Sequence, residues 1–307
     1  MTVPAPITLD NTQLSAFMRC PRYYYYAHVE HLAPARLPEP LGFGLALARG
    51  QEVWHAERAR GAEFLPALRK AIREACIVAR DPEWAPEDAD DASPWLFSSY
   101  TRSLETLLRT LVWYADRYRE DAFRVLVAPH TNKPAVELSF SLDLSPSLVF
   151  CGHMDRVGEF GGSVLVGECK HTTGNIGAFY FGSFQHDAQT TGYVWAAKAL
   201  GLPAVGVVLD ASQVAVSFSR FHRDLIHKSE AQLQSWYDTI QIVAQEIQTR
   251  LESTPYTMHA FRKNYSACYA RGPCPYLPLC SAPSEDIRRA EIATSFTPRH
   301  WDPLQIR

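Results

Sequence analysis

The chain has 307 residues, of which 47% are hydrophobic, so a substantial core is expected and a largely disordered chain is excluded. Its formal net charge of −3 at pH 7 excludes a surface that is basic throughout, but it leaves room for a local basic groove. No apolar run reaches the length of a membrane span and no secretory signal begins the chain, so we expect a cytoplasmic protein that contacts no membrane.

The first element that the sequence predicts is a short helix over residues 12–20, capped by Asp10, Asn11 or Thr12 and ended by Pro21. Four consecutive tyrosines follow at positions 23–26. Tyrosines in such a run can stack on nucleobases, but they more often pack half-buried against a core. Both interpretations stay open at this point, and packing is the preferred one.

A block of helices is predicted next. One helix opens at Gly50 and contains His55, and two more are expected over residues 62–80 and 98–119. Residues 81–94 are acidic and contain three prolines, which is typical of an exposed loop. We interpret residues 56–130 as a helical insertion that interrupts a catalytic domain.

Three strands are predicted after this block. Residues 135–142 alternate between apolar and polar, residues 148–151 form a strand that runs into Asp155, and residues 163–166 form a strand that ends in Glu168-Cys169-Lys170. Side chains alternate between the two faces of a strand, so Glu168 and Lys170 are expected on one face and Cys169 on the other.

A strand pair of this kind can place Asp155 beside Glu168 and Lys170. Two carboxylates would then offer oxygen ligands to a hard divalent cation, and the lysine would add a positive charge where a phosphate or hydroxide would lie. The alternative interpretation of the same three residues is a surface salt bridge, which contributes little to stability.

The remaining elements complete an α/β pattern. A helix is predicted over residues 184–200 with Gln189 and Tyr193 on one face, followed by strands at 205–210 and 214–219 and a long helix over 223–252. Strands that alternate with helices predict a central mixed sheet with helices on its faces.

Cys268, Cys274 and Cys280 are separated by five residues each in a segment rich in proline and glycine. Evenly spaced thiols in an irregular segment indicate a metal centre, and both zinc and iron–sulfur clusters commonly take four ligands. Cys20, which precedes a proline, is the natural fourth ligand. Cys76, Cys151 and Cys169 lie in predicted helices or strands and are interpreted as ordinary buried cysteines.

Taken in order, these motifs resemble the PD-(D/E)XK nuclease superfamily, in particular its RecB-like branch with an iron–sulfur cluster, which includes AddB-type, CRISPR-adaptation and phage nucleases. The resemblance spans almost the whole chain and implies one nuclease domain over 1–307 with a restriction-endonuclease-like core. Its sheet would span 135–220, and residues 221–307 would supply a helix and the cysteine segment. The matching residues are Cys20, Gly50 and His55, Glu137, Asp155, Glu168 to Lys170, Gln189 and Tyr193, and the three C-terminal cysteines.

The resemblance implies a role for each of these residues. His55, Asp155, Glu168 and the carbonyl group of Cys169 would bind Mg²⁺ or Mn²⁺, and Lys170 would orient water or stabilise the transition state. Glu137 would support a second metal or the water network, while Gln189 and Tyr193 would position the scissile strand. Cys20, Cys268, Cys274 and Cys280 would hold a structural [4Fe-4S] cluster, with zinc as the alternative. DNA phosphates would be contacted by Arg19, Arg22, Arg262, Lys263 and Arg271, each of which could equally be a solvated surface charge.

The implied function is a metal-dependent DNA nuclease, most readily an exonuclease on single strands or duplex ends, with DNA and a helicase or another DNA-processing protein as partners. One alternative is a catalytically silent nuclease-like protein that binds DNA ends or helps an assembly. Another is a zinc-stabilised enzyme with a different substrate.

Overall fold

The computed structural model describes residues 6–35, 38–80, 99–128, 131–253, 258–270 and 272–304. The loop expected at 81–94 and Arg271 lie outside these residues. Contacts divide the chain into two compact units: unit 1 takes in residues from 1–36, 140–152 and 234–307, and unit 2 takes in residues from 37–139 and 153–233. The interpretation of the chain as one domain with an insertion at 56–130 stays a prediction.

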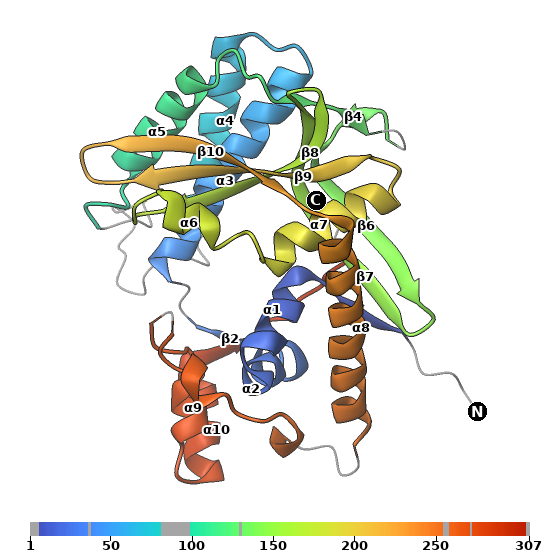
Figure 1. Ribbon diagram of the computed structural model, residues 1–307. Coiled ribbons are helices and arrows are strands. Elements are labelled where there is room, and N and C mark those ends of the chain that lie inside the picture. The colour runs from blue at the N-terminus through green and yellow to red at the C-terminus, as the bar shows by residue number, and fades with distance from the viewer. Residues whose placement is uncertain are drawn as a thin grey trace. The chain divides into compact units, whose positions relative to one another are not determined.

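The elements of unit 1 come from both ends of the chain (Figure 1). They are β1 (Ile7–Leu9), α1 (Asn11–Arg19), α2 (Pro21–Tyr24), the π-helix η1 (Tyr25–Val29), β2 (Leu32–Pro34), the 3-10 turns η3 (Met258–Ala260) and η4 (Tyr265–Ala267), α9 (Leu277–Ser281), α10 (Glu285–Ser295) and β11 (Phe296–Pro298). Three elements have residues in both units: β6 (Val136–Ser145), β7 (Leu148–Phe160) and α8 (Glu230–Glu252).

Unit 2 contains the remaining elements. They are α3 (Glu39–Ala59), α4 (Phe64–Val78), α5 (Leu104–Arg117), β3 (Arg124–Val125), β4 (Val127–Ala128), β5 (Lys133–Pro134), β8 (Ser163–Thr172), α6 (Ala178–Gly182), α7 (Ala188–Ala199), β9 (Ala204–Val214) and β10 (Ser219–His227).

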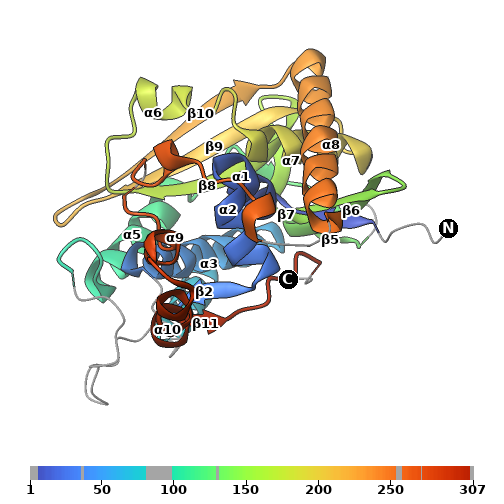
Figure 2. The same ribbon diagram turned by 90° about the horizontal axis from the view of Figure 1, so that it is seen from below.

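The sheet of unit 2 is mixed. The second half of β7 pairs antiparallel with β8, β8 pairs parallel with β9, and β9 pairs antiparallel with β10. Helices α3, α4 and α5 cover one face of this sheet, and α6 and α7 lie on the other; Figure 2 shows the same layers from a second direction. This arrangement confirms the predicted α/β class with a central mixed sheet between helices.

The three helices on the first face pack through small residues. Gly50 of α3 faces α5 and α4, and a Cβ atom added there would lie 2.6 Å from Leu111 Cδ2 and 3.2 Å from Ala75 Cβ. Leu47, Ala75 and Leu111 belong to one buried cluster of this interface. Gly50 therefore sets the closeness of α3 to its neighbours, and that closeness holds the following turn, with His55, in place.

The N-terminal tyrosines pack into unit 1 rather than standing free. Tyr24, Tyr25 and Tyr26 are buried. The ring of Tyr26 stacks on that of Tyr276 with centroids 5.4 Å apart, and the ring of Tyr24 stacks on Phe261 at 6.3 Å. The packing interpretation of this run is confirmed, and it joins the two terminal segments of the chain within unit 1.

One sequence-based element prediction was partly wrong in type, and others differ in their boundaries. The helix expected over 223–252 begins only at Glu230, because residues 219–227 pair with β9 as strand β10. The helix containing His55 begins at Glu39 rather than at Gly50. The helix expected over 184–200 also differs in its boundaries, because α7 begins only at Ala188 and ends at Ala199.

Candidate functional site

Glu168, Lys170, Gln189 and Tyr193 form one chain of hydrogen bonds in unit 2. Lys170 Nζ donates to Glu168 Oε1 at 2.6 Å and to Gln189 Oε1 at 2.8 Å. Gln189 Nε2 in turn donates to Tyr193 OH at 3.3 Å, because the two residues lie one turn apart on α7. The lysine ammonium is thereby held between a strand carboxylate and a helix amide.

Asp155 and Glu168 stand where β7 and β8 reach the end of their paired register. The pairs run from Phe160↔Ser163 to Arg156↔Gly167, so Asp155 and Glu168 occupy the next position on the two strands. The backbone N–H of Cys169 donates to Asp155 Oδ2 at 2.7 Å across this position. The two carboxylates predicted from the sequence are thus brought together.

The environment of Glu168 disfavours its negative charge. Glu168 is 2% exposed, and burial followed by the charge of Asp155 raises the pKa of Glu168 to about 7, although Lys170 opposes the shift. Burial alone would lower the pKa of Lys170, but the charge and hydrogen bond of Glu168 raise it above its ordinary value. Glu168 Oε2 is buried and has no hydrogen-bond partner among the described residues. An orphaned carboxylate oxygen beside a second carboxylate is the donor set that a hard cation prefers.

His55 lies on the opposite face of the sheet, within a buried polar network. Arg156 NH1 is 2.6 Å from His55 Nε2, and Arg156 NH2 donates to Asp210 Oδ2 at 2.5 Å. Tyr114 OH also donates to Asp210 Oδ2 at 2.7 Å and lies 2.8 Å from His55 Nε2. Burial and then the positive charge of Arg156 hold the pKa of His55 well below its ordinary value, so the imidazole is neutral.

This network determines the tautomer of His55 and therefore which ring nitrogen carries the lone pair that could bind a metal. A guanidinium has donors and no acceptor, so the contact with Arg156 makes Nε2 the acceptor and assigns the ring proton to Nδ1. While this contact holds, the Nε2 lone pair points at Arg156. A metal at His55 would therefore compete with the guanidinium for the same lone pair.

Arg156 fits beneath the sheet because its partner on β8 is a glycine. A Cβ atom at Gly167 would lie 2.5 Å from Arg156 Nε and 2.6 Å from its Cγ.

Asp210 also accepts a hydrogen bond from a second arginine, Arg223, whose Nε lies 2.9 Å from Asp210 Oδ2. Burial alone would raise the pKa of Asp210, but the charges of Arg156 and Arg223 lower it, so this carboxylate stays ionised.

A small cavity of about 20 Å³ lies beside His55, Asp155 and Cys169. It also receives Glu137 and Glu52, and Glu137 has φ of 47°, an uncommon backbone conformation for a residue with a side chain. Glu52 was not predicted from the sequence, although its place one turn before His55 on α3 is a signal that could have identified it. Arg156, Tyr114 and Asp210 were also missed.

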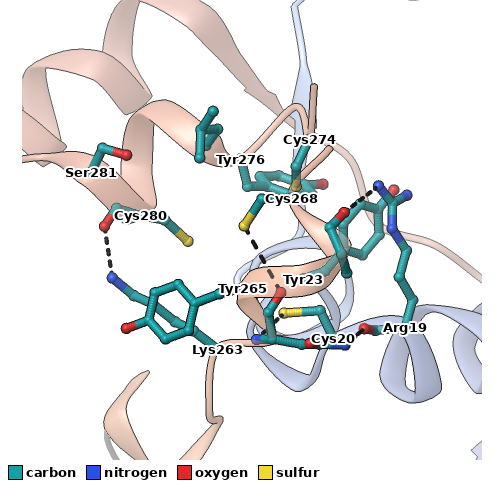
Figure 3. A pocket seen from close by; sticks show the side chains of 13 residues that line it. Arg19, Cys20, Tyr23, Lys263, Tyr265, Cys268, Cys274, Tyr276, Cys280 and Ser281 are labelled. Atoms are coloured by element: carbon teal, nitrogen blue, oxygen red, sulfur yellow. Dashed lines mark hydrogen bonds between the residues drawn. The ribbon is translucent and has the colours of Figure 1, made fainter. Parts of the chain in front are cut away.

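The four cysteines Cys20, Cys268, Cys274 and Cys280 line a second cavity, of about 110 Å³, within unit 1 (Figure 3). They enter it from the end of α1, from η4, from the loop before α9 and from α9 itself. Cys274 N donates to Cys268 O at 2.8 Å, which folds this loop back on itself. None of the four cysteines is joined in a disulfide bond.

The surroundings of these thiols combine burial with nearby cations. Burial raises the pKa of Cys274 and of Cys280, and the negative charge that Cys20 would carry as a thiolate raises both further. Lys263 Nζ donates to Cys280 O at 2.7 Å, and the Arg19 guanidinium lies over the ring of Tyr23, 5.1 Å from its centroid. Within the described residues, no group of three or more His, Cys, Asp or Glu side chains is arranged to hold a single metal ion.

The basic residues predicted to contact DNA fall into different environments. Arg262 is exposed, and Arg19 and Lys263 are half-buried beside the cysteine cavity. Arg22 is only 5% exposed and its Nε donates to Phe261 O at 2.9 Å, so we remove it from the candidate DNA surface. Arg271 lies outside the described residues.

No described helix is both long and apolar enough to cross a membrane.

Most of the chain matches a known protein family. Residues 9–281 match the profile of the PD-(D/E)XK nuclease superfamily. A search of curated proteins gave no match. The matched segment contains every predicted site residue in unit 2 and all four cysteines of the cavity. The chain belongs to the PD-(D/E)XK nuclease superfamily.

Proposed function

We propose that this protein is a metal-dependent DNA nuclease that hydrolyses phosphodiester bonds at the site around Glu168. The observation that carries the proposal is the buried Glu168 carboxylate, with Asp155 at its side, Lys170 on one oxygen and an unpartnered second oxygen. In a surface salt bridge the carboxylate would be exposed, and water would hydrogen-bond to both of its oxygens. The burial of Glu168 and its unpartnered oxygen therefore argue against that alternative.

The residues present fit a divalent cation. Glu168 and Asp155 offer carboxylate oxygens, and the Cys169 carbonyl is a further oxygen donor between them, so these three residues would hold Mg²⁺ or Mn²⁺. His55 would join them only by giving up its contact with Arg156. A bound cation would neutralise charge on the scissile phosphate and lower the pKa of an attacking water.

Lys170 is oriented for the reacting phosphate. An ammonium group has three N–H donors, and Glu168 and Gln189 accept from two of them. The third is available among the described residues to orient the attacking water or to donate to a phosphate oxygen as negative charge develops. Tyr193 and Gln189 keep this group fixed, which limits the reorganisation needed during the reaction.

The test is cleavage of labelled DNA by the purified protein with Mn²⁺ or Mg²⁺. Lys170→Ala and Asp155→Ala are expected to reduce the rate by at least about a hundredfold. Lys133→Ala and Asp143→Ala, which alter exposed side chains, serve as matched controls and should cleave normally. Cleavage that survives Lys170→Ala and Asp155→Ala would rule out this site. Tight DNA binding without turnover under either metal would instead support the catalytically silent alternative.

We extend the proposal to an exonuclease on single strands or duplex ends, as in the RecB-like branch. Linear and covalently closed circular single-stranded DNA of equal sequence distinguish the modes of action. Degradation of the linear form alone supports an exonuclease, and equal degradation of both supports an endonuclease. A helicase or other DNA-processing partner belongs to the same extension, and co-purification from the native host would test it.

We also propose that Cys20, Cys268, Cys274 and Cys280 hold a [4Fe-4S] cluster. The proposal is supported by the four cysteines, none of them in a disulfide bond, that line one cavity. Metal analysis of anaerobically purified protein tests it. About four irons and four sulfides per chain support the cluster, whereas one zinc ion without sulfide supports the alternative.

A further inference from the structure

Between β8 and α7 the chain contains four aromatic residues within six positions. One of them points into solvent. Phe181 is 3% exposed, and Tyr180 and Phe184 are half-buried. The ring of Tyr180 packs on those of Phe181 and Phe184 with centroids 5.4 Å and 5.3 Å away. Phe179, the first of the group in α6, is 96% exposed.

The segment that presents Phe179 is anchored at several points. Phe181 packs into a cluster with Leu209, Ala211 and Ile226 of β9 and β10. Lys228, itself 5% exposed, donates from Nζ to the carbonyl oxygens of Phe184 at 3.1 Å and Gln185 at 2.9 Å. The exposed ring is therefore held on an ordered support.

The anchor also fixes where the ring lies relative to the candidate active site. Ala211, against which Phe181 packs, is the register partner of Lys170 on the neighbouring strand. Paired residues of adjacent strands share a face and lie about 5 Å apart, so α6 stands on the face of Glu168 and Lys170, one strand away. Tyr180, next to Phe179, is close enough for the charge of Lys170 to act on its phenol group.

We infer that Phe179 is a stacking platform for an unpaired nucleobase of the DNA strand whose phosphate lies at Lys170. The inference rests on the proposed nuclease function and adds a substrate-positioning residue to it. A phenyl ring offers a flat apolar face to any base, so the contact is tolerant of sequence. A base inside an intact duplex has both faces covered by its neighbours, so this contact selects single strands or frayed ends.

The position of the ring on the face of Lys170 favours a DNA strand as the occupant. Single exposed apolar side chains are common and need no function by themselves. Phe179 differs because its helix is anchored through Phe181 on Ala211, the register partner of Lys170, on the face of the sheet that carries the candidate active site. A protein partner would need a wider apolar surface, whereas the rings next to Phe179 in sequence are already packed on each other.

The test is a double-mutant cycle on DNA binding, measured by fluorescence anisotropy in the absence of catalytic metal. Phe179→Ala is expected to weaken binding of a single-stranded oligonucleotide about tenfold, since the stack between the ring and one base is lost. Oligonucleotides with one abasic residue, scanned along the strand, should reproduce this loss at one position. At that position Phe179→Ala should cause no further loss.

Two further variants serve as controls. Phe179→Trp should bind at least as tightly as the unchanged protein, and Tyr100→Ala, which removes an 88% exposed ring elsewhere in unit 2, should bind normally. Equal binding by Phe179→Ala, or additive losses at every abasic position, would overturn the inference. Because binding is measured without turnover, a Phe179-dependent stack in a protein that cleaves nothing would overturn the proposed nuclease activity and leave the platform standing.

Discussion

Arg156 and Asp210 form an ion pair with 2.5 Å between NH2 and Oδ2, and the two side chains are only 1% and 0% exposed. The pair lies directly behind the candidate active site, because Arg156 follows Asp155 on β7 and also contacts His55. Two charges removed from water in this way are stable only while each keeps its partners. The pair therefore couples the integrity of the core to the position of His55.

Asp210→Ala should destabilise the metal-free protein by about 3–5 kcal/mol, because it leaves the Arg156 guanidinium buried without its carboxylate. Urea unfolding measures the change. Asp116→Ala removes an exposed carboxylate that pairs with Arg119, and its expected effect is at most about 1 kcal/mol. A loss for Asp210→Ala no larger than that of Asp116→Ala would show that the buried pair is not needed for stability.

Glu168 should make the metal-free protein less stable as pH rises. Its folded-state pKa of about 7 lies above the ordinary value of 4.5, so between these values the folded state binds more protons than the unfolded state. Stability then falls as pH increases from about 4.5 to 7, by an amount on the order of 3 kcal/mol. Thermal unfolding in EDTA at pH 5 and pH 8 measures it.

Glu168→Gln should flatten this dependence and stabilise the protein at pH 8, whereas Glu159→Gln at an exposed position should leave it unchanged. Added Mn²⁺ should reverse the trend for the unchanged protein, since a cation binds only the deprotonated carboxylate. Stability that rises between pH 5 and pH 7 in EDTA, equally in Glu168→Gln and the unchanged protein, would contradict the raised pKa.

Two glycines of α3 provide a matched pair for the packing of the helical layer. Gly50→Ala should destabilise the protein by about 1–2 kcal/mol, because the new Cβ atom meets Leu111 and Ala75 in a closed core. Gly44→Ala has no atom within 4 Å of its Cβ position and should instead stabilise by about 0.5–1 kcal/mol through helix propensity. Equal effects of the two substitutions, measured by urea unfolding, would show that close packing at Gly50 is not what this position requires.

The sequence allowed strand β8 to be predicted because alternation is a local rule. Glu168 and Lys170 were expected on one face, and the salt bridge between them confirms that expectation. The position of Asp155 beside Glu168 followed from a strand pair joined by a tight Gly161-Gly162 turn, whose residues have φ of 59° and 79°. Each inference needed only residues close together in the chain.

The parts that sequence reasoning missed depend on partners far apart in the chain. Residues 219–227 form a strand because β9 pairs with them at nine positions, and nothing within that segment excludes the start of a helix. Likewise, Arg156 and Asp210 are 54 positions apart, and each alone is typical of a solvated surface charge. Only the assembled sheet shows that both are buried and that Arg156 contacts Nε2 of His55.

The last prediction concerns Cys280, which lies on α9 with its carbonyl bonded to Lys263. If the four thiols share an iron–sulfur cluster, Cys280→Ala should remove the broad visible absorbance of anaerobically purified protein and lower its iron content. It should also destabilise unit 1, since a cross-link from Cys20 to residues 268–280 closes a very long loop, and a covalent analogue of this length contributes roughly 3–5 kcal/mol. Cys76→Ala, a half-buried thiol on α4 of unit 2, is the matched control and should keep both colour and stability. Full iron content in Cys280→Ala or in Cys20→Ala would mean that the cavity thiols do not act together, and the cluster would have to be assigned to other ligands.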